Sequence, residues 1–390
     1  MTDTPSPTRS GEPIDDRGAE PSLTAPVERR WWHSRWVHGA LSLGVVALIF
    51  GFLFPKVADY GEVWNTITAM TGLEAAVLVL IAGWNLVSYW PVLTATLPGL
   101  RLREAAVSNL ASTAVSNTLP GGAAIGVGVT FTMQRSWGIA VSETALAAVI
   151  AGIWNNFVKL GLPIVALALL AVSGDVGAGL VAASLAGLAI LIVAIVGFAA
   201  LLRSPVMAAR LGAAAGATAN VVRRMFRREP VVGWNLRAQG FRAEVVGLLT
   251  QRWARITVTT LLSHFSLFLV LLVALRQVGV SEGQVGWTTV LAAFAFVRLL
   301  SAIPLTPGGL GVVELGLTAA LGSGLPDSTK NQVAAAVLVY RGLTWFVPIP
   351  LGIGCWVFWR VNTSWRRTIP ERRRWIADAA APEPVAKAGS

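Results

Sequence analysis

The sequence has few charged residues and few of the side chains that build metal or redox sites. Charged residues make up 13% of the 390 positions, roughly half the share found in soluble domains. A single cysteine, Cys355, excludes an internal disulfide framework and a multi-cysteine metal site. Only three histidines occur, and no group of histidines and carboxylates has the spacing of metal ligands. We therefore expect neither a metal nor another cofactor.

Several functional motifs are absent as well. No glycine-rich phosphate-binding loop of the ATPase type occurs, which argues against ATP-driven pumping by this chain. No paired carboxylates and no nucleophile with a matching base are apparent, so we expect no enzymatic activity and assign no catalytic residue. A signal peptide is not expected, because the first apolar run begins near Val37, behind the bulky stretch "RRWWHSRW".

Apolar side chains make up most of the sequence. They form 54% of the chain and give a mean hydropathy of +0.64, which indicates an integral membrane protein. The apolar runs predict six full spans, at 37–54, 73–97, 141–172, 177–201, 256–275 and 331–359. Two further stretches, 105–134 and 286–322, each contain a Pro-Gly-Gly sequence near the middle.

The placement of arginine predicts the orientation in the membrane. The net charge of +11 comes from basic residues beside the apolar runs, as the positive-inside rule requires, and not from a nucleic-acid-binding pattern. Segment 203–254 is strongly basic, whereas the linkers near 55–72, 173–176, 278–285 and 323–330 are poor in arginine and carry acids. We predict a multi-pass protein of the cell membrane with both termini in the cytoplasm.

This charge pattern has a consequence for the two Pro-Gly-Gly stretches. Each begins and ends on one side of the membrane, so each is predicted to be a re-entrant helical hairpin. The order span, hairpin, span then occurs twice, at 73–172 and 256–359, in opposite orientations. The predicted fold is an all-α polytopic membrane protein with about six full spans and two re-entrant hairpins in an inverted repeat. The alternative is eight spans, with the hairpins counted differently or the last segment split at "VPIP" (347–350).

The chain is expected to contain one membrane domain with polar tails. Residues 1–36 are predicted to be a disordered cytoplasmic tail with an interfacial anchor, 37–360 the transmembrane domain, and 361–390 a basic cytoplasmic tail. The basic segment 203–254 joins the repeat halves. It contains apolar residues on one helical face with arginines beside them, which predicts an amphipathic helix on anionic inner-leaflet lipids; the apolar residues are Phe241, Val245, Leu248 and Leu249.

The broken hairpins predict an anion site. A helix that begins inside a membrane directs unpaired N–H groups and the positive end of its dipole into a cavity. The residues predicted to form the two helix starts are Pro307, Gly308, Gly309 and Gly311 in the second hairpin, and Pro120, Gly121 and Gly122 in the first, with Ser116 and Asn117 as polar lining.

Charged residues inside the apolar runs are further candidates. Arg298 and Arg341 can each pair with an anion, and Glu314 can serve as their counter-charge or carry protons. The structural alternative is that both arginines reach the interface or pair with Glu314. Lys159 is expected near an interface, and His264 is expected to be a satisfied core residue.

At these motifs the sequence resembles a known family. "IPLTPGGLGVVELG" (303–316) and "VLVYRGLTWFVPIPLG" (337–352) resemble the flippase-like membrane domain of the lysylphosphatidylglycerol synthase family, and "NTLPGGAAIGVGVTFTMQRSWG" (117–138) is similar to its first half. Many members carry an acid soon after those first glycines, whereas here the next acid is Glu143. The resemblance covers roughly 37–360. It implies re-entrant helices and a domain that moves lipids between leaflets. We do not expect lysyl transfer, because that activity belongs to a separate soluble domain.

The leading hypothesis is therefore a lipid translocase for a phospholipid or lipid-linked molecule, with an anionic headgroup held at the broken-helix N-termini. Two alternatives stay open: a secondary transporter of a small anion, and a non-catalytic membrane partner of envelope-synthesis enzymes. No nucleic-acid partner is expected. The sequence leaves the oligomeric state open, a homo-oligomer included.

Overall fold

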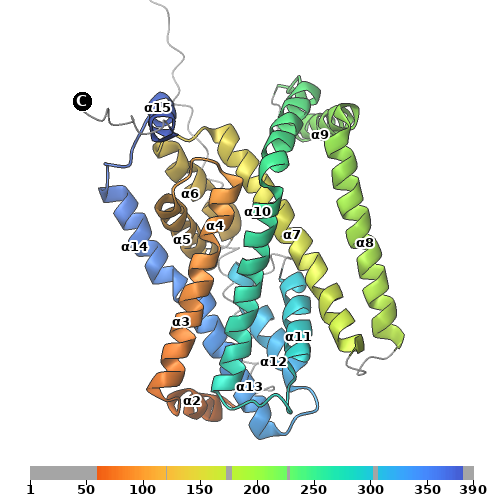
Figure 1. The fold of residues 1–390 in the computed structure, drawn as a ribbon, viewed down its shortest axis with the longest axis vertical. Coiled ribbons are helices and arrows are strands. Elements are labelled where there is room, and N and C mark those ends of the chain that lie inside the picture. The colour runs from red at the N-terminus through yellow and green to blue at the C-terminus, as the bar shows by residue number, and fades with distance from the viewer. Residues whose placement is uncertain (1–58, 120, 173–177, 226–228, 302–305, 381–390) are drawn as a thin grey trace, which may run out of the picture.

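The computed structural model describes residues 59–119, 121–172, 178–225, 229–301 and 306–380. The predicted N-terminal tail and the first predicted span, 37–54, lie outside these residues. Every regular element within the described ranges is helical, so the all-α prediction is confirmed. Figure 1 shows long helices running in the same general direction, with shorter helices between them and across the ends.

Five segments of the described chain are long and apolar enough to cross a membrane, which makes this a multi-pass membrane protein. They correspond to the last five of the six predicted spans. They are α3 with α4 (Gly72–Ser88 and Trp90–Thr96), α7 (Val141–Val172), α8 (Ala178–Arg203), α10 (Trp234–Gln277), and the segment Asp327–Val361.

The last of these segments runs past "VPIP" as one candidate span. It comprises α13 (Asp327–Arg341), a π-helical turn η4 (Gly342–Phe346) and α14 (Pro348–Val361). The turn is closed by a hydrogen bond from Val347 N–H to Gly342 O, 2.9 Å between N and O. Such a wide turn accommodates the proline that follows without ending the helix.

Two pairs of short helices lie between the spans. The first pair is α5 (Leu102–Thr118) with α6 (Gly122–Ser136), and the second is α11 (Trp287–Leu300) with α12 (Val312–Gly322). The four helices contain 17, 15, 14 and 11 residues. At 1.5 Å per residue they are roughly 16–26 Å long, less than the roughly 30 Å of a bilayer core. In Figure 1 the first pair lies in the half of the molecule that carries α15, and the second lies in the half that carries α2 (Tyr60–Thr68).

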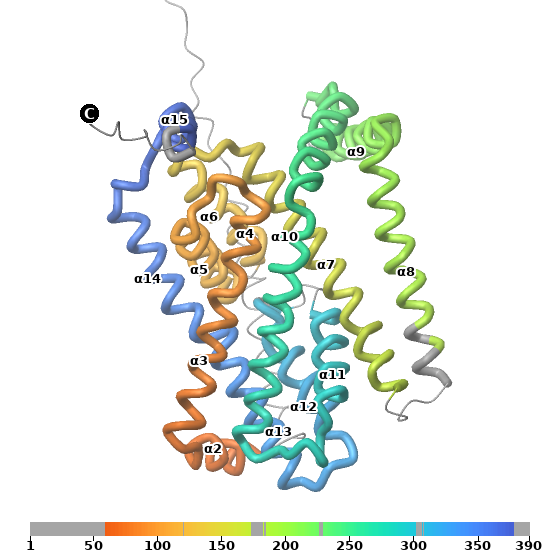
Figure 2. The backbone as a smooth tube through the Cα atoms, viewed as in Figure 1, coloured from red at the N-terminus to blue at the C-terminus, as the bar shows by residue number. Residues whose placement is uncertain are grey.

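The largest core cluster surrounds α10, which runs through the centre of the molecule in Figure 2. Phe268 of α10 packs against Phe294 of α11, with 5.9 Å between the ring centroids. Small residues let the helices approach closely, since Ala295 and the run Ala334–Ala336 are fully buried. Close packing matters here because lipid tails are as apolar as leucine, and burial alone does not drive helix association.

Segment 203–254 is folded differently from our prediction. It forms α9 (Pro205–Met225) and the first part of the 44-residue α10. The predicted lipid-facing residues Val245 and Leu249 are buried against Ile150 of α7. The apolar face predicted to contact lipids packs against neighbouring helices instead, because it belongs to a helix that continues into a candidate span. Contact of this segment with anionic lipids stays a prediction.

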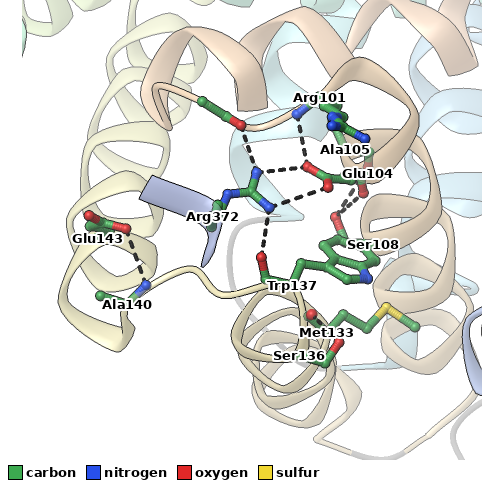
Figure 3. A network of polar contacts seen from close by, with 11 residues as sticks. Arg101, Glu104, Ala105, Ser108, Met133, Ser136, Trp137, Ala140, Glu143 and Arg372 are labelled. Atoms are coloured by element: carbon green, nitrogen blue, oxygen red, sulfur yellow. Dashed lines mark hydrogen bonds and ion pairs between the residues drawn. The ribbon is translucent and has the colours of Figure 1, made fainter. Parts of the chain in front are cut away.

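The segment after the last span also contains more structure than the predicted tail. Helix α15 (Ile369–Ala380) is held by Arg372, which is 4% exposed. One guanidinium nitrogen of Arg372 donates to Glu104 Oε2 (2.8 Å) and Gly99 O (2.6 Å), and the other donates to Trp137 O (2.9 Å), as Figure 3 shows. Because Glu104 lies in the first turn of α5 and Trp137 is the C-cap of α6, Arg372 ties both ends of the first helix pair to α15.

Candidate functional site

The two glycine-rich turns predicted from the sequence lie side by side. The turn η3 (Pro307–Gly309), which precedes α12, packs against α5 of the first pair. Asn117, near the end of α5, donates from Nδ2 to Trp345 O of η4 at 3.0 Å. The tips of both helix pairs and the π-helical turn of the last span therefore meet at one place in the interior.

Glycine permits the backbone of the second turn. Gly308, Gly309 and Gly311 have φ values of 59°, 71° and 84°, in the left-handed region that other residues rarely adopt. Space is limiting too, since a Cβ on Gly308 would collide with the indole ring of Trp345. The predicted half-helix begins at Val312 and not at Pro307, because η3 forms a separate 3₁₀ turn. The predicted start of this helix therefore lies about one turn before the observed start.

A buried ion pair lies at that helix start. Glu314 is 1% exposed, and its Oε2 accepts a hydrogen bond from Gly311 N–H at 2.6 Å. Its Oε1 accepts from Arg341 Nε, also at 2.6 Å, and Arg341 donates further to Gly308 O at 3.0 Å. The chain's own carboxylate therefore occupies the place where a ligand anion was predicted, and the structural pairing of Glu314 with Arg341 is the arrangement observed.

Beside this pair is a polar cavity of about 270 Å³. Three cationic side chains line it: Lys159 from α7, Arg298 from α11 and Arg341 from α13. No acidic residue is among the described residues of its wall. Glu314 is not part of the described wall, and it neutralises the charge of Arg341 through their ion pair. Lys159 and Arg298 therefore leave an excess of positive charge at the cavity. Such a site favours an anion.

Arg298 carries a buried hydrogen-bond donor that has no acceptor among the described residues. Arg298 lines the same cavity as Lys159 and Arg341, which carry charge of the same sign. Its Nε is buried and has no hydrogen-bond partner within the described chain. A buried guanidinium donor without an acceptor is costly, and an anion in the cavity would satisfy it.

The structure brings only some of the predicted residues to this cavity. Those that line it are Asn117, Arg298, Gly308 and Arg341, whereas Gly309, Gly311 and Glu314 are not among the described residues of its wall. Gly121 and Gly122 form the turn between α5 and α6 and do not line the cavity. Pro120 lies outside the described residues. Ser116 donates to Gly122 O within the first pair at 3.3 Å.

Sequence reasoning misplaced one cavity residue. Lys159 was expected near an interface, yet it lies in the middle of the 32-residue helix α7. Its distance from both ends of the apolar run was the signal that could have identified it, because a lysine that deep cannot easily reach either interface. His264 is a buried core residue as expected, with Nδ1 3.0 Å from Thr260 O, but it is not fully satisfied, because its buried Nε2 has no partner among the described residues.

With this geometry established, the chain can be compared with known families. A family model described as the lysylphosphatidylglycerol synthase TM region matches residues 39–352. The chain belongs to this family. The family region includes both helix pairs and all described residues of the cavity wall, and it ends before α15. No curated protein matches the chain.

Proposed function

We propose that this member of the lysylphosphatidylglycerol synthase TM region family moves an anionic phospholipid or lipid-linked molecule between the two leaflets. The observation that carries the proposal is the cavity between the tips of the helix pairs, where Lys159, Arg298 and Arg341 meet. A lipid phosphate would pair with Arg298 and Lys159 while Arg341 stays bound to Glu314. The excess charge of the cavity would thereby be neutralised.

In this proposal the two helix pairs enter the membrane from opposite sides and return without crossing it. Their short lengths support this placement, as does the arginine-rich end formed by α9 and α15, which we assign to the cytoplasm. The segments α3–α7 and α10–α14 follow the same order of long and short helices in opposite directions. Sites of secondary transporters lie near the midplane between such repeats.

The size of the cavity bears on what it can hold. Pockets that enclose a whole drug-sized ligand typically measure about 300–1,000 Å³, and this cavity of about 270 Å³ is smaller. It suits a phosphate with part of a headgroup, while the acyl chains stay in the bilayer. The same observation favours the second candidate function, transport of a small anion, so the test must separate the two.

Lipid translocation in proteoliposomes tests the proposal. Purified protein is reconstituted with fluorescent headgroup-labelled anionic lipids, and an impermeant quencher reports the label that reaches the outer leaflet. One charge-assisted hydrogen bond contributes about 1.5–3 kcal/mol, so Lys159→Gln should slow translocation roughly 10-fold or more, and Lys159→Arg should restore part of the rate. Lys330→Gln is the matched control, because Lys330 pairs with Asp327 at an exposed helix start.

Each result has a defined meaning. Translocation that is lost in Lys159→Gln and kept in Lys330→Gln supports a lipid-moving protein with its site in this cavity. Equal rates in wild type and Lys159→Gln would show that the site is elsewhere. No lipid movement together with uptake of labelled phosphate would replace the proposal with small-anion transport.

A further inference from the structure

A second cavity lies at the arginine-rich end of the molecule. It measures about 570 Å³ and is enclosed by α7, α8, α9 and α10. Its wall is apolar except for Arg237 and Arg242 and shares no described residue with the central cavity. Large apolar contributors are Ile153, Phe198, Leu202, Leu211 and Phe241.

Two hydrogen-bond donors in this wall lack acceptors. Arg242 Nε and Trp234 Nε1 are both buried, and neither has a hydrogen-bond partner within the described residues. Arg237 lies three residues after Trp234 and five before Arg242 on α10, and it is an exposed residue of the same wall. Buried donors that are left unpaired are rare in proteins, and each one calls for an explanation. Ten buried polar side-chain atoms of the described residues have no partner, and two of them belong to residues of this one apolar wall. A ligand with an acceptor at one end and an apolar body would satisfy both.

The charge around the cavity indicates the sign of that acceptor. Helix α9 lies across the ends of α8 and α10 in Figure 1, and the surrounding segment is dense in arginine. Between 203 and 254 the only acids are Glu229 and Glu244. The arginines of this segment include Arg203, Arg210, Arg223, Arg224, Arg237 and Arg242, and the last two line the cavity. An anionic headgroup at the interface is the matching partner.

The apolar surroundings indicate a lipid. On α8, outside the cavity, Val193 and Val196 are exposed on the surface of the molecule, as expected for side chains that face acyl chains. The cavity volume falls within the range of pockets that hold ligands of several hundred daltons. A single acyl chain can therefore lie in this cavity while the phosphate of the same lipid stays at the level of Arg242.

We propose that this cavity binds an anionic phospholipid of the cytoplasmic leaflet. One acyl chain lies between α7, α8 and α10, and the phosphate accepts hydrogen bonds from Arg242 and Trp234, with Arg237 at the mouth. The bound lipid is held and not transported, and it braces α9 against α10. This site is independent of the translocation proposed for the central cavity.

Native mass spectrometry of the full-length protein in detergent tests this site. Dioleoyl-phosphatidic acid is added as the anionic probe and dioleoyl-phosphatidylcholine as the probe with the same chains. Wild type should bind phosphatidic acid at least 10-fold more tightly than phosphatidylcholine. Arg242→Gln should remove most of this preference, and Arg242→Gln with Trp234→Phe should remove the rest. Arg255→Gln is the matched control, because Arg255 is an exposed arginine of the same helix outside the cavity wall.

The outcomes separate this proposal from others. Retention of phosphatidic acid binding in Lys159→Gln supports a site distinct from the central cavity. Equal binding of the two probes by wild type would overturn the headgroup assignment. An equal loss of the preference for phosphatidic acid in Arg242→Gln and Arg255→Gln would also overturn it. The overall positive charge of the helix, and not the cavity, would then explain the binding.

Discussion

Removing the positive charge of Arg341 should destabilise the protein strongly. Glu314 is 1% exposed, and its described partners are Arg341 and the Gly311 N–H. Arg341→Gln leaves this carboxylate buried with the backbone donor alone. Breaking a buried ion pair by removing one partner costs about 3–5 kcal/mol. At roughly 2 °C per kcal/mol for a large domain, the Tm should fall by about 6–10 °C.

Thermal unfolding in detergent, followed by tryptophan fluorescence, measures this change. The double variant Glu314→Gln with Arg341→Gln removes both charges and keeps a side chain that can accept from Gly311 N–H. It should recover at least half of the loss in Tm, because no uncompensated charge remains. Lys330→Gln breaks an exposed pair and should lower the Tm by less than about 2 °C.

Function should return together with stability in this set. The proposed phosphate ligands Arg298 and Lys159 remain in the double variant, and loss of the Glu314–Arg341 pair leaves the net charge unchanged, so lipid translocation should recover as the Tm does. Two results would refute the reasoning. One is a Tm for Arg341→Gln within 2 °C of wild type, and the other is a double variant no more stable than Arg341→Gln alone.

Two further changes test the surroundings of the site. Gly308→Ala places a Cβ at φ 59° against an indole ring and should lower the Tm by several degrees, whereas Gly83→Ala, in a helix with open space around it, should leave the Tm unchanged or raise it. Arg372→Gln removes the side chain that ties α15 to the first helix pair and leaves Glu104 buried at 1% exposure. Limited proteolysis between α14 and α15 should therefore become faster than in wild type, and exposed Arg373→Gln should show no change.

Much of the architecture followed from the sequence because hydropathy and charge act locally. A run of about 20 apolar residues can satisfy its backbone in lipid only as a helix, and five of the six predicted spans lie in the described residues. The glycine motif at 308–311 was identifiable in the same way, since glycine adopts the left-handed backbone found there far more readily than other residues. The pattern of short helix pairs between spans was likewise readable from their Pro-Gly-Gly interruptions.

Other features depended on which helices face one another. Lys159, Arg298 and Arg341 lie on three different helices, and no spacing along the chain relates them. The apolar face of α10 near Val245 packs against α7, which a single helix cannot reveal, because a lipid-facing and a protein-facing stripe have the same periodicity.

The sequence by itself determined the membrane class, the helical spans, the glycine turns and the family. Only the tertiary structure decided that Glu314 holds Arg341, that three cations converge on one cavity, and that Arg372 fastens α15 to the first helix pair. The physical reason is the separation along the chain of the residues that determine each feature. Backbone conformation and hydropathy are set by neighbouring residues, whereas charge pairing depends on distances in space between residues such as Glu104 and Arg372, which are 268 positions apart.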